Sequence, residues 1–138
     1  MRSRKAHRRG FTLIELIAVI VVLAILSGVA IPRYFDYAAK AKESSARGIL
    51  GGVRSSIANF YGMSASNGIL AYPTLVQMQT TGTVMQEVLP NNPYNNDNKI
   101  TAAVWAATPP VSGTDGWNYD AATGKFWCNS NTVSENTW

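Results

Sequence analysis

Apolar and polar positions follow two different patterns in the first half of the chain. Residues 11–31 are predominantly apolar, and a run of that length can cross the roughly 30 Å hydrocarbon core of a bilayer as a helix. From residue 33 to residue 61, apolar side chains recur at steps of three and four, which predicts an amphipathic helix. Together the two segments predict one helix of about 50 residues. Its expected apolar stripe comprises Ile49, Leu50, Val53, Ile57, Phe60 and Tyr61.

Three glycines interrupt the second half of this predicted helix. Gly48, Gly51 and Gly52 each weaken a helix by up to about 1 kcal/mol relative to alanine. We expect them to allow a sheet or a neighbouring helix to approach closely.

From residue 62 onward the composition changes to Gly, Ser, Asn, Thr and Pro with short apolar runs. "GMSASNG" and "LPNNPYNNDN" predict loops, and "YPTLVQMQ" a short turn of helix. "ITAAVWAAT" is typical of a strand. "GWNYDAATGKFWCN" predicts two strands joined by a hairpin, in which Gly124 takes a positive φ. The expected fold class is α+β, with the long helix packed on a small antiparallel sheet.

The charge of the chain is concentrated at its start. The formal net charge is +4, and five basic residues precede Phe11 (Arg2, Arg4, Lys5, Arg8 and Arg9). Seven basic residues face eight acidic ones in the rest of the chain, so the body is close to neutral and nucleic acid is not an expected partner. A basic segment before an apolar run stays on the cytoplasmic side of a membrane.

Few residues are available for catalysis. His7, the only histidine, lies in the basic segment, so a chain cleaved after that segment has none. Histidine-dependent nucleophiles and zinc sites are then excluded, and we do not expect an enzyme. Cys128 is the only cysteine, so no intramolecular disulfide can form. A buried Cys128 is favoured over an exposed thiol.

Three interpretations compete for the first 32 residues: a secretory signal cut after Ala30, a twin-arginine signal, and a class III leader cut before the apolar run. Glu15 discriminates among them, because a cleaved signal gains nothing from a carboxylate. A charge at the bilayer centre costs roughly 2.5–3.5 kcal/mol, and less near the interface. If the chain began at Phe11, Glu15 would lie about one helical turn from the end, where it could meet a terminal ammonium.

The stretch "RRGFTLIELIAVIVVLAILSGVAIPRYFDYAAKAKESSARGIL" closely resembles the amino-terminal segment of type IV pilins and type II secretion pseudopilins. The resemblance implies cleavage between Gly10 and Phe11 by a prepilin peptidase and N-methylation of Phe11. It implies that Glu15 pairs with the terminal amine of an adjacent subunit, and that the helix kinks or melts near Gly28 and Pro32. The implied organisation is a cleaved leader (1–10), a membrane and filament-core helix (11–32) and a globular head (33–138).

The carboxy-terminal part resembles the same family more weakly. "GWNYDAATGKFWCN" is similar to the closing hairpin of pseudopilins. Many type IVa pilins close a carboxy-terminal loop with two cysteines, so a single Cys128 favours a pseudopilin or a divergent pilin. Some major pseudopilins bind calcium in these loops. Asp97, Asp115 and Asp120 are the available acids, but their spacing matches no calcium motif and turn roles are favoured. No other cofactor is expected.

We therefore expect a structural subunit that polymerises with itself and with minor pilins or pseudopilins. Its other implied partners are prepilin peptidase, an inner-membrane assembly platform and, before assembly, membrane lipid. The implied location is the bacterial inner membrane, single-pass with the head on the periplasmic side, and afterwards a periplasmic or extracellular filament. The sequence leaves open whether that filament is a pilus or a secretion pseudopilus.

Two surfaces allow other functions. An alternative to the filament subunit is a membrane-anchored periplasmic module that binds a glycan or a protein, although core packing is favoured for the aromatic cluster that it would use: Trp105, Trp117, Tyr119, Phe126 and Trp127. The basic residues on the helix could contact DNA, but salt bridges between subunits, with Asp36 and Glu43, account for them more simply. Those basic residues are Arg33, Lys40, Lys42 and Arg47.

Overall fold

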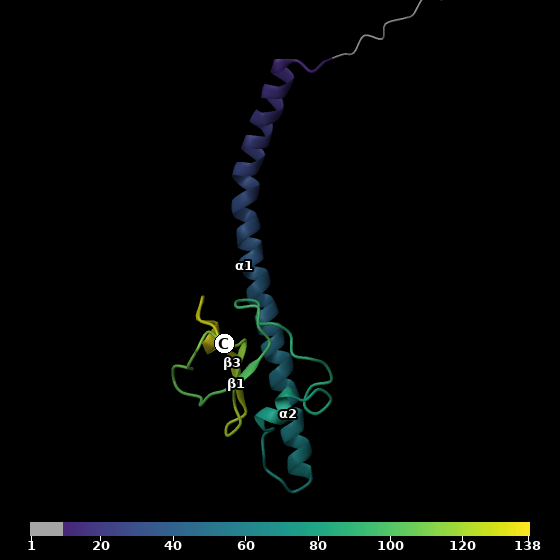
Figure 1. Ribbon diagram of the computed structural model, residues 1–138, viewed down its shortest axis with the longest axis vertical. Coiled ribbons are helices and arrows are strands. Elements are labelled where there is room, and N and C mark those ends of the chain that lie inside the picture. Colours follow the sequence, from purple (N-terminus) through teal and green to yellow (C-terminus); the bar gives the residue numbers. More distant parts are fainter. Residues whose placement is uncertain (1–9) are drawn as a thin grey trace, which may run out of the picture. The chain divides into compact units, whose positions relative to one another are not determined.

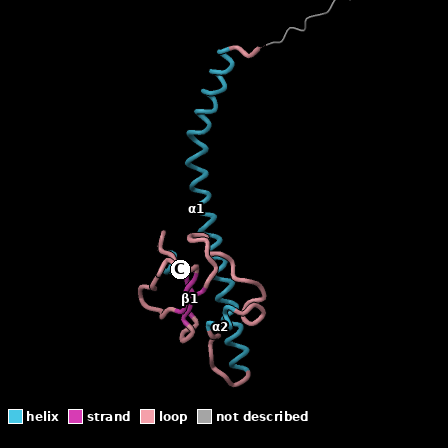
Figure 2. The backbone as a smooth tube through the Cα atoms, viewed as in Figure 1, coloured by secondary structure: helices cyan, strands magenta, loops and turns pink. Residues whose placement is uncertain are grey.

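The computed structural model describes residues 10–138, so the basic residues of the expected leader lie outside the described residues. The chain divides into two compact units, Met1–Ala39 and Lys40–Trp138, each described here by itself. The elements are helix α1 (Leu13–Ser66), helix α2 (Leu75–Gln79), strands β1 (Ile100–Ala102), β2 (Trp117–Asp120) and β3 (Lys125–Cys128), and a final 3₁₀ turn, η1 (Glu135–Thr137) (Figures 1 and 2). The expected α+β class is confirmed.

Helix α1 is 54 residues long, close to the expected length, and is continuous through Gly28 and Pro32. It extends five residues into "GMSASNG", where the sequence predicted a loop. The loop prediction was wrong for Gly62–Ser66, because the helix ends at Ser66 and the terminating glycine is Gly68 rather than Gly62. Gly68 has φ +81°, its N–H donates to the carbonyl of Ala65 at 3.0 Å, and the N–H of Ile69 donates to Ser64 at 2.9 Å. These two bonds form a Schellman motif, which satisfies carbonyls at the end of a helix.

The second half of α1 packs against the remainder of the second unit through one stripe. Leu50, Val53 and Ile57 are buried as expected, and Ala46, which was not predicted, is buried with them. Their core partners come from α2, the loops and the sheet, and include Met78, Leu89, Ile100, Trp117, Tyr119 and Phe126. The expectation for the three glycines was wrong within this chain: a Cβ added at Gly48, Gly51 or Gly52 meets no described atom within 4 Å.

The sheet has the order β1-β2-β3 and is mixed rather than wholly antiparallel. Strands β2 and β3 form the expected antiparallel hairpin, with Asp120 opposite Lys125 and Gly124 at φ +69°. Strand β1 instead runs parallel to β2, with Ile100 opposite Trp117. The chain leaves the sheet after Ala102 and returns beside the start of β1, so the expected strand "ITAAVWAAT" is only three residues long.

Both faces of the hairpin are covered, which the sequence did not predict. One face packs on the core described above, and residues 105–112 cover the other. The carbonyl of Pro110 accepts hydrogen bonds from Asn118 and from the Trp127 indole, both at 2.9 Å. The Trp105 ring lies edge-on to Trp127, with centroids 5.2 Å apart. Four of the five clustered aromatic residues are therefore buried, and only Trp105 is partly exposed.

Candidate functional site

The apolar segment, residues 11–31, exposes all of its large apolar side chains. Each of its large apolar side chains is between 42% and 92% exposed. Within α1, an 18-residue window reaches a mean hydropathy of 2.9 with none of its residues buried. At 1.5 Å per residue, 21 residues extend about 30 Å, the thickness of a hydrocarbon core. An apolar surface of this size marks contact with lipid or with other protein.

Glu15 has a local role that the sequence analysis missed. Its Oε2 accepts hydrogen bonds from the N–H and the hydroxyl of Thr12, both at 2.8 Å, and its own N–H donates to the Thr12 hydroxyl at 3.3 Å. These reciprocal bonds form a capping box, which satisfies N–H groups at the start of a helix. The signal for it was the threonine three residues before the glutamate. Within a single chain, the carboxylate therefore has Thr12 as a partner, and pairing with a terminal amine stays a prediction.

The expected cleavage point lies in accessible backbone. Gly10 and Phe11 precede the first residue of α1, and Phe11 is 92% exposed. No described atom lies within 4 Å of a Cβ built on Gly10. A protease that acts between these residues would meet exposed chain outside the helix.

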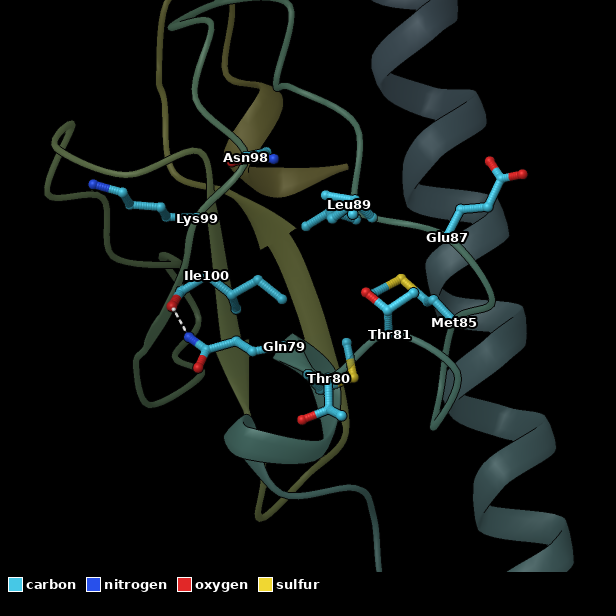
Figure 3. A pocket seen from close by; sticks show the side chains of 11 residues that line it. Gln79, Thr80, Thr81, Met85, Glu87, Leu89, Asn98, Lys99 and Ile100 are labelled. Carbon is cyan, nitrogen blue, oxygen red and sulfur yellow. Dashed lines mark hydrogen bonds between the residues drawn. The ribbon is translucent and has the colours of Figure 1, made fainter.

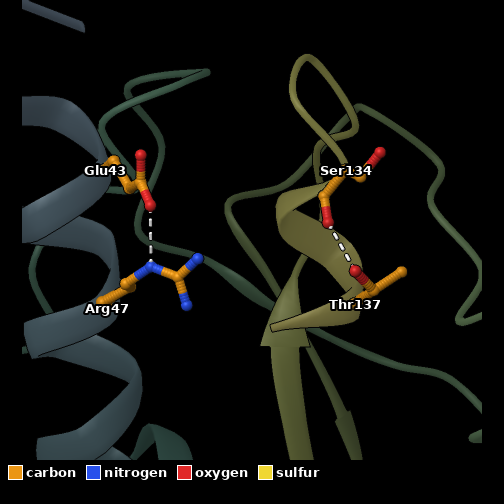
Figure 4. A network of polar contacts seen from close by, with 4 residues as sticks. All are labelled: Glu43, Arg47, Ser134 and Thr137. Carbon is orange, nitrogen blue, oxygen red and sulfur yellow. Dashed lines mark hydrogen bonds and ion pairs between the residues drawn. The ribbon is translucent and has the colours of Figure 1, made fainter. Parts of the chain in front are cut away.

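The expected partner of Arg47 lies in its own chain. Arg47 Nε is 3.0 Å from Glu43 Oε1, one helical turn away (Figure 4). Its guanidinium also lies 4.0 Å above the Trp138 ring. The sequence analysis expected Glu43 to form a salt bridge between subunits. In the structure Glu43 and Arg47 pair within one chain, because residues four apart on a helix are neighbours. Close by, the Thr137 hydroxyl donates to the Ser134 carbonyl in η1 at 2.7 Å (Figure 4).

Arg54 holds the carboxy-terminal segment onto α1, a role that its sequence position did not reveal. Its guanidinium donates to the carbonyl of Phe126 on β3, at 3.0 Å from Nε and 2.8 Å from a terminal nitrogen, and also to the carbonyl of Trp138. The residue as a whole is exposed, but partial desolvation of its guanidinium lowers the pKa of Arg54. Arg54 therefore satisfies a carbonyl on the outer strand of the sheet.

The three acids considered for calcium each bond to nearby protein groups. Asp97 accepts from the N–H of Lys99 at 2.6 Å, and Asp115 accepts from the hydroxyl of Thr101. Asp120 accepts from Trp105, Ala122 and Thr123 at 2.9–3.0 Å. Burial opposes ionisation of Asp120, but these hydrogen bonds outweigh it and lower its pKa. Among the described residues, no three acidic, cysteine or histidine side chains gather as a metal site would require. Calcium binding stays untested.

Cys128 is fully buried, as the sequence favoured. Burial, followed by the nearby charge of Glu135, raises the pKa of its thiol to about 12. Because the thiolate is the reactive form, Cys128 is an inert core residue at neutral pH.

Two cavities of the second unit are lined in part by residues of the strands. One of about 240 Å³ has apolar lining residues that include Met78, Met85 and Leu89 (Figure 3). Among its polar lining residues, Gln79 Nε2 donates to the Ile100 carbonyl at 3.1 Å (Figure 3). A second, of about 490 Å³, is lined by aromatic and basic side chains that include Tyr72, Trp105 and Lys125.

The amino-terminal segment of the chain is similar to that of known proteins. Residues 5–31 match the family described as the prokaryotic N-terminal methylation motif. The chain is 34% identical to the type IV major fimbrial protein FimA of Dichelobacter nodosus over 97 residues, which are 69% of this chain and 60% of FimA. It is 40% identical to the fimbrial protein EcpC of Eikenella corrodens over 57 residues, or 41% of this chain and 37% of EcpC.

A third relative is the type IV major pilin protein PilE1 of Neisseria gonorrhoeae, 44% identical over 54 residues, or 39% of this chain and 33% of PilE1. The chain thus covers less than two thirds of each of these relatives. No solved structure matches the chain.

Proposed function

We propose that the chain belongs to the type IV pilin family and is a structural subunit of a pilus-like filament, stored in a membrane before assembly. The observation that carries the proposal is the exposed apolar segment with one carboxylate, Glu15, near its start. Lipid covers this segment in the stored subunit, and neighbouring helices cover it in the filament. No catalytic step is required of the protein.

Cleavage and methylation of the amino terminus prepare the subunit to exchange lipid contact for contact with neighbouring helices. The basic leader stays on the cytoplasmic side, the bond between Gly10 and Phe11 is cut by a prepilin peptidase, and the new amine of Phe11 is methylated. The second unit then lies on the far side of the membrane. Exposed backbone at Gly10 and the match to the methylation motif support this order of events.

Glu15 changes partners during assembly. In the stored subunit, Thr12 satisfies its carboxylate at the helix start. In the filament core, Glu15 pairs with the amine of a neighbouring chain, because a buried charge without a partner is strongly disfavoured. An assembly platform extracts the subunit, and the pairing sets the register of each incoming copy. Pro32 and Gly28 mark where the helix can deform in the filament.

Two observations bear on the kind of filament. A single, buried Cys128 excludes an intramolecular disulfide and favours a pseudopilin or a divergent pilin, whereas all three of the similar proteins are fimbrial proteins or type IV pilins, which we give the greater weight. A type IV pilus-like filament is therefore the first candidate, and a type II secretion pseudopilus the second. The glycan-binding alternative gains no support, because four of its five aromatic residues are buried.

Replacement of Glu15 tests the proposal. Glu15→Ala removes the carboxylate, so we expect normal insertion in the membrane fraction and loss of the protein from sheared filaments. Glu43→Ala is the matched control, because it removes a half-exposed carboxylate, together with its ion pair to Arg47, from the same helix outside the apolar segment. Filaments from Glu15→Ala in wild-type amount would contradict the proposal.

A further inference from the structure

Three aromatic residues follow the apolar segment directly and are strongly exposed. Tyr34, Phe35 and Tyr37 are 70%, 66% and 63% exposed. The rings of Tyr34 and Phe35 touch edge to face, with centroids 6.1 Å apart. No core of the first unit covers these rings, so another environment must account for them.

The arrangement of these side chains is that of an amphipathic helix surface. At about 100° per residue, the three rings occupy an arc of about 160° around α1. Arg33 and Asp36 lie together within about 60° on the other side of the helix. Tyrosine and tryptophan, which have a polar tip, are enriched where a transmembrane helix meets the headgroup layer. An arginine near the end of such a helix can extend its charge into the same layer.

We propose that Tyr34, Phe35 and Tyr37, with Arg33, form an interfacial anchor that lies in the outer phospholipid headgroup layer and thereby fixes the depth of Glu15. The inference rests on the proposed function, because it requires a membrane-stored subunit. Its partner is the phospholipid headgroup layer itself. There the three rings contact the upper part of the acyl chains, and the Arg33 guanidinium contacts a lipid phosphate.

The distance along the helix connects the anchor to Glu15. Tyr34 lies nineteen positions after Glu15, which is about 28 Å of helix. A hydrocarbon core is about 30 Å thick. With the anchor at the outer edge, Glu15 and its Thr12 cap lie at the inner edge, where a charge costs much less than at the bilayer centre.

The anchor predicts a different deepest residue in the bilayer from the one that the apolar segment alone would predict. If residues 11–31 alone set the depth, the deepest position is near their midpoint, residue 21. If Glu15 and Tyr34 lie at the two edges, the deepest position is near residue 24. The two cases differ by three residues, or about 4–5 Å of depth.

Spin-label depth measurements on the full chain in phosphatidylethanolamine–phosphatidylglycerol vesicles, at a high lipid-to-protein ratio, separate these cases. Single cysteines are introduced one at a time between positions 18 and 42, and collisions with oxygen and with a water-soluble nickel complex are compared. The native Cys128 is buried, so wild-type chain gives the labelling background. We expect the deepest label near residue 24 and the interfacial value at residues 34–37.

Two triple variants complete the test. Tyr34→Ser with Phe35→Ser and Tyr37→Ser should move the deepest label to about residue 21. Ala38→Ser with Ala39→Ser and Ala41→Ser, the matched control one turn later, should leave it near residue 24. A deepest label near residue 21 in wild-type chain, or no shift in the aromatic variant, would overturn the anchor while leaving membrane storage intact.

Two further outcomes are also decisive. Labels at positions 34–37 that are shielded from both reagents would indicate contact with a second copy in place of lipid, and would overturn the anchor. Chain that fails to float with the vesicles would overturn the anchor and the proposed membrane storage together.

Discussion

The two units bury their apolar side chains in opposite ways. In the first unit, the large apolar side chains of residues 11–31 are all exposed, whereas Trp117 and Trp127 in the second unit are completely buried. Both units have strongly apolar elements, so hydrophobicity alone does not separate them. The difference is that the second unit supplies its own cover, from α1 on one face of the hairpin and residues 105–112 on the other. The described residues of the first unit supply no such cover.

The largest effect should come from truncation in the sheet. Trp117→Ala removes a fully buried side chain that stacks on Phe126 at 5.3 Å, so we expect the second unit to lose about 3–5 kcal/mol of unfolding free energy. Leu23→Ala, in the apolar segment, should leave that free energy unchanged within about 0.5 kcal/mol. Denaturant unfolding of detergent-solubilised full chain, followed by near-ultraviolet circular dichroism, measures both. Equal losses would contradict the independence of the two units.

Removal of Arg54 should produce the next largest effect. Arg54→Ala leaves the Phe126 carbonyl without its guanidinium donor, so we expect a loss of about 1–3 kcal/mol from the second unit. Lys42→Ala is the control, since it removes an exposed charge from the same helix. The same denaturant unfolding gives both values. A loss no larger than that of the control would mean that water replaces Arg54 at this strand.

Acid should destabilise the second unit through a buried carboxylate that the sequence did not single out. Glu135 is fully buried and accepts from the N–H groups of Thr132 and Val133 at 3.0 and 2.7 Å. Burial opposes ionisation, but the hydrogen bonds outweigh it, so the pKa of Glu135 lies below its ordinary 4.5. A lowered pKa stabilises the fold above the unfolded value, and the contribution is lost as pH falls through the folded value.

The pH effect has a direct measurement. We expect the melting temperature of wild-type chain to fall as the pH is lowered below about 4.5. Glu135→Gln should lower it at neutral pH and make its acid dependence shallower. Glu87→Gln, at an exposed position, should keep the wild-type melting temperature at neutral pH. A Glu135→Gln variant with wild-type stability at pH 7 would show that the carboxylate is dispensable.

The smallest effects concern two glycines with opposite surroundings. Gly52 lies within α1 and faces open space, so Gly52→Ala should stabilise the second unit by about 0.5–1 kcal/mol. Gly124 has φ +69°, and a Cβ there would overlap the ring of Tyr72, so Gly124→Ala should destabilise it by about 1–2 kcal/mol. Thermal unfolding of both variants checks the signs. Destabilisation by Gly52→Ala would indicate a close contact at the glycine face.

Local sequence patterns predicted the helices and the hairpin. The contacts between residues far apart in the sequence were not predicted. The step of three and four residues located Leu50, Val53 and Ile57 on the buried face of α1, and Gly124 marked the hairpin. The parallel pairing of β1 with β2 was missed because it joins Ile100 to Trp117 across a long loop that has no periodicity. The cover over Trp127 was missed because it depends on the carbonyl of Pro110, which no side-chain pattern reveals.

The functional residues divide in the same way. The sequence around them was enough to single out Gly10, Phe11 and Glu15 as candidate functional residues. The capping box of Thr12 and Glu15 could also have been predicted, from the spacing of three residues. Arg54 and Glu135 could not, since their partners are backbone groups brought to them by the fold.

The central claim is that the apolar segment begins at a processed amino terminus and is covered by other copies of the chain. Mass spectrometry of the amino-terminal peptide from sheared filaments tests it most directly. We expect a peptide that starts at Phe11 and carries one N-methyl group. A peptide that starts at Met1, or a chain cut after Ala30 so that it begins at Ile31, would contradict the claim.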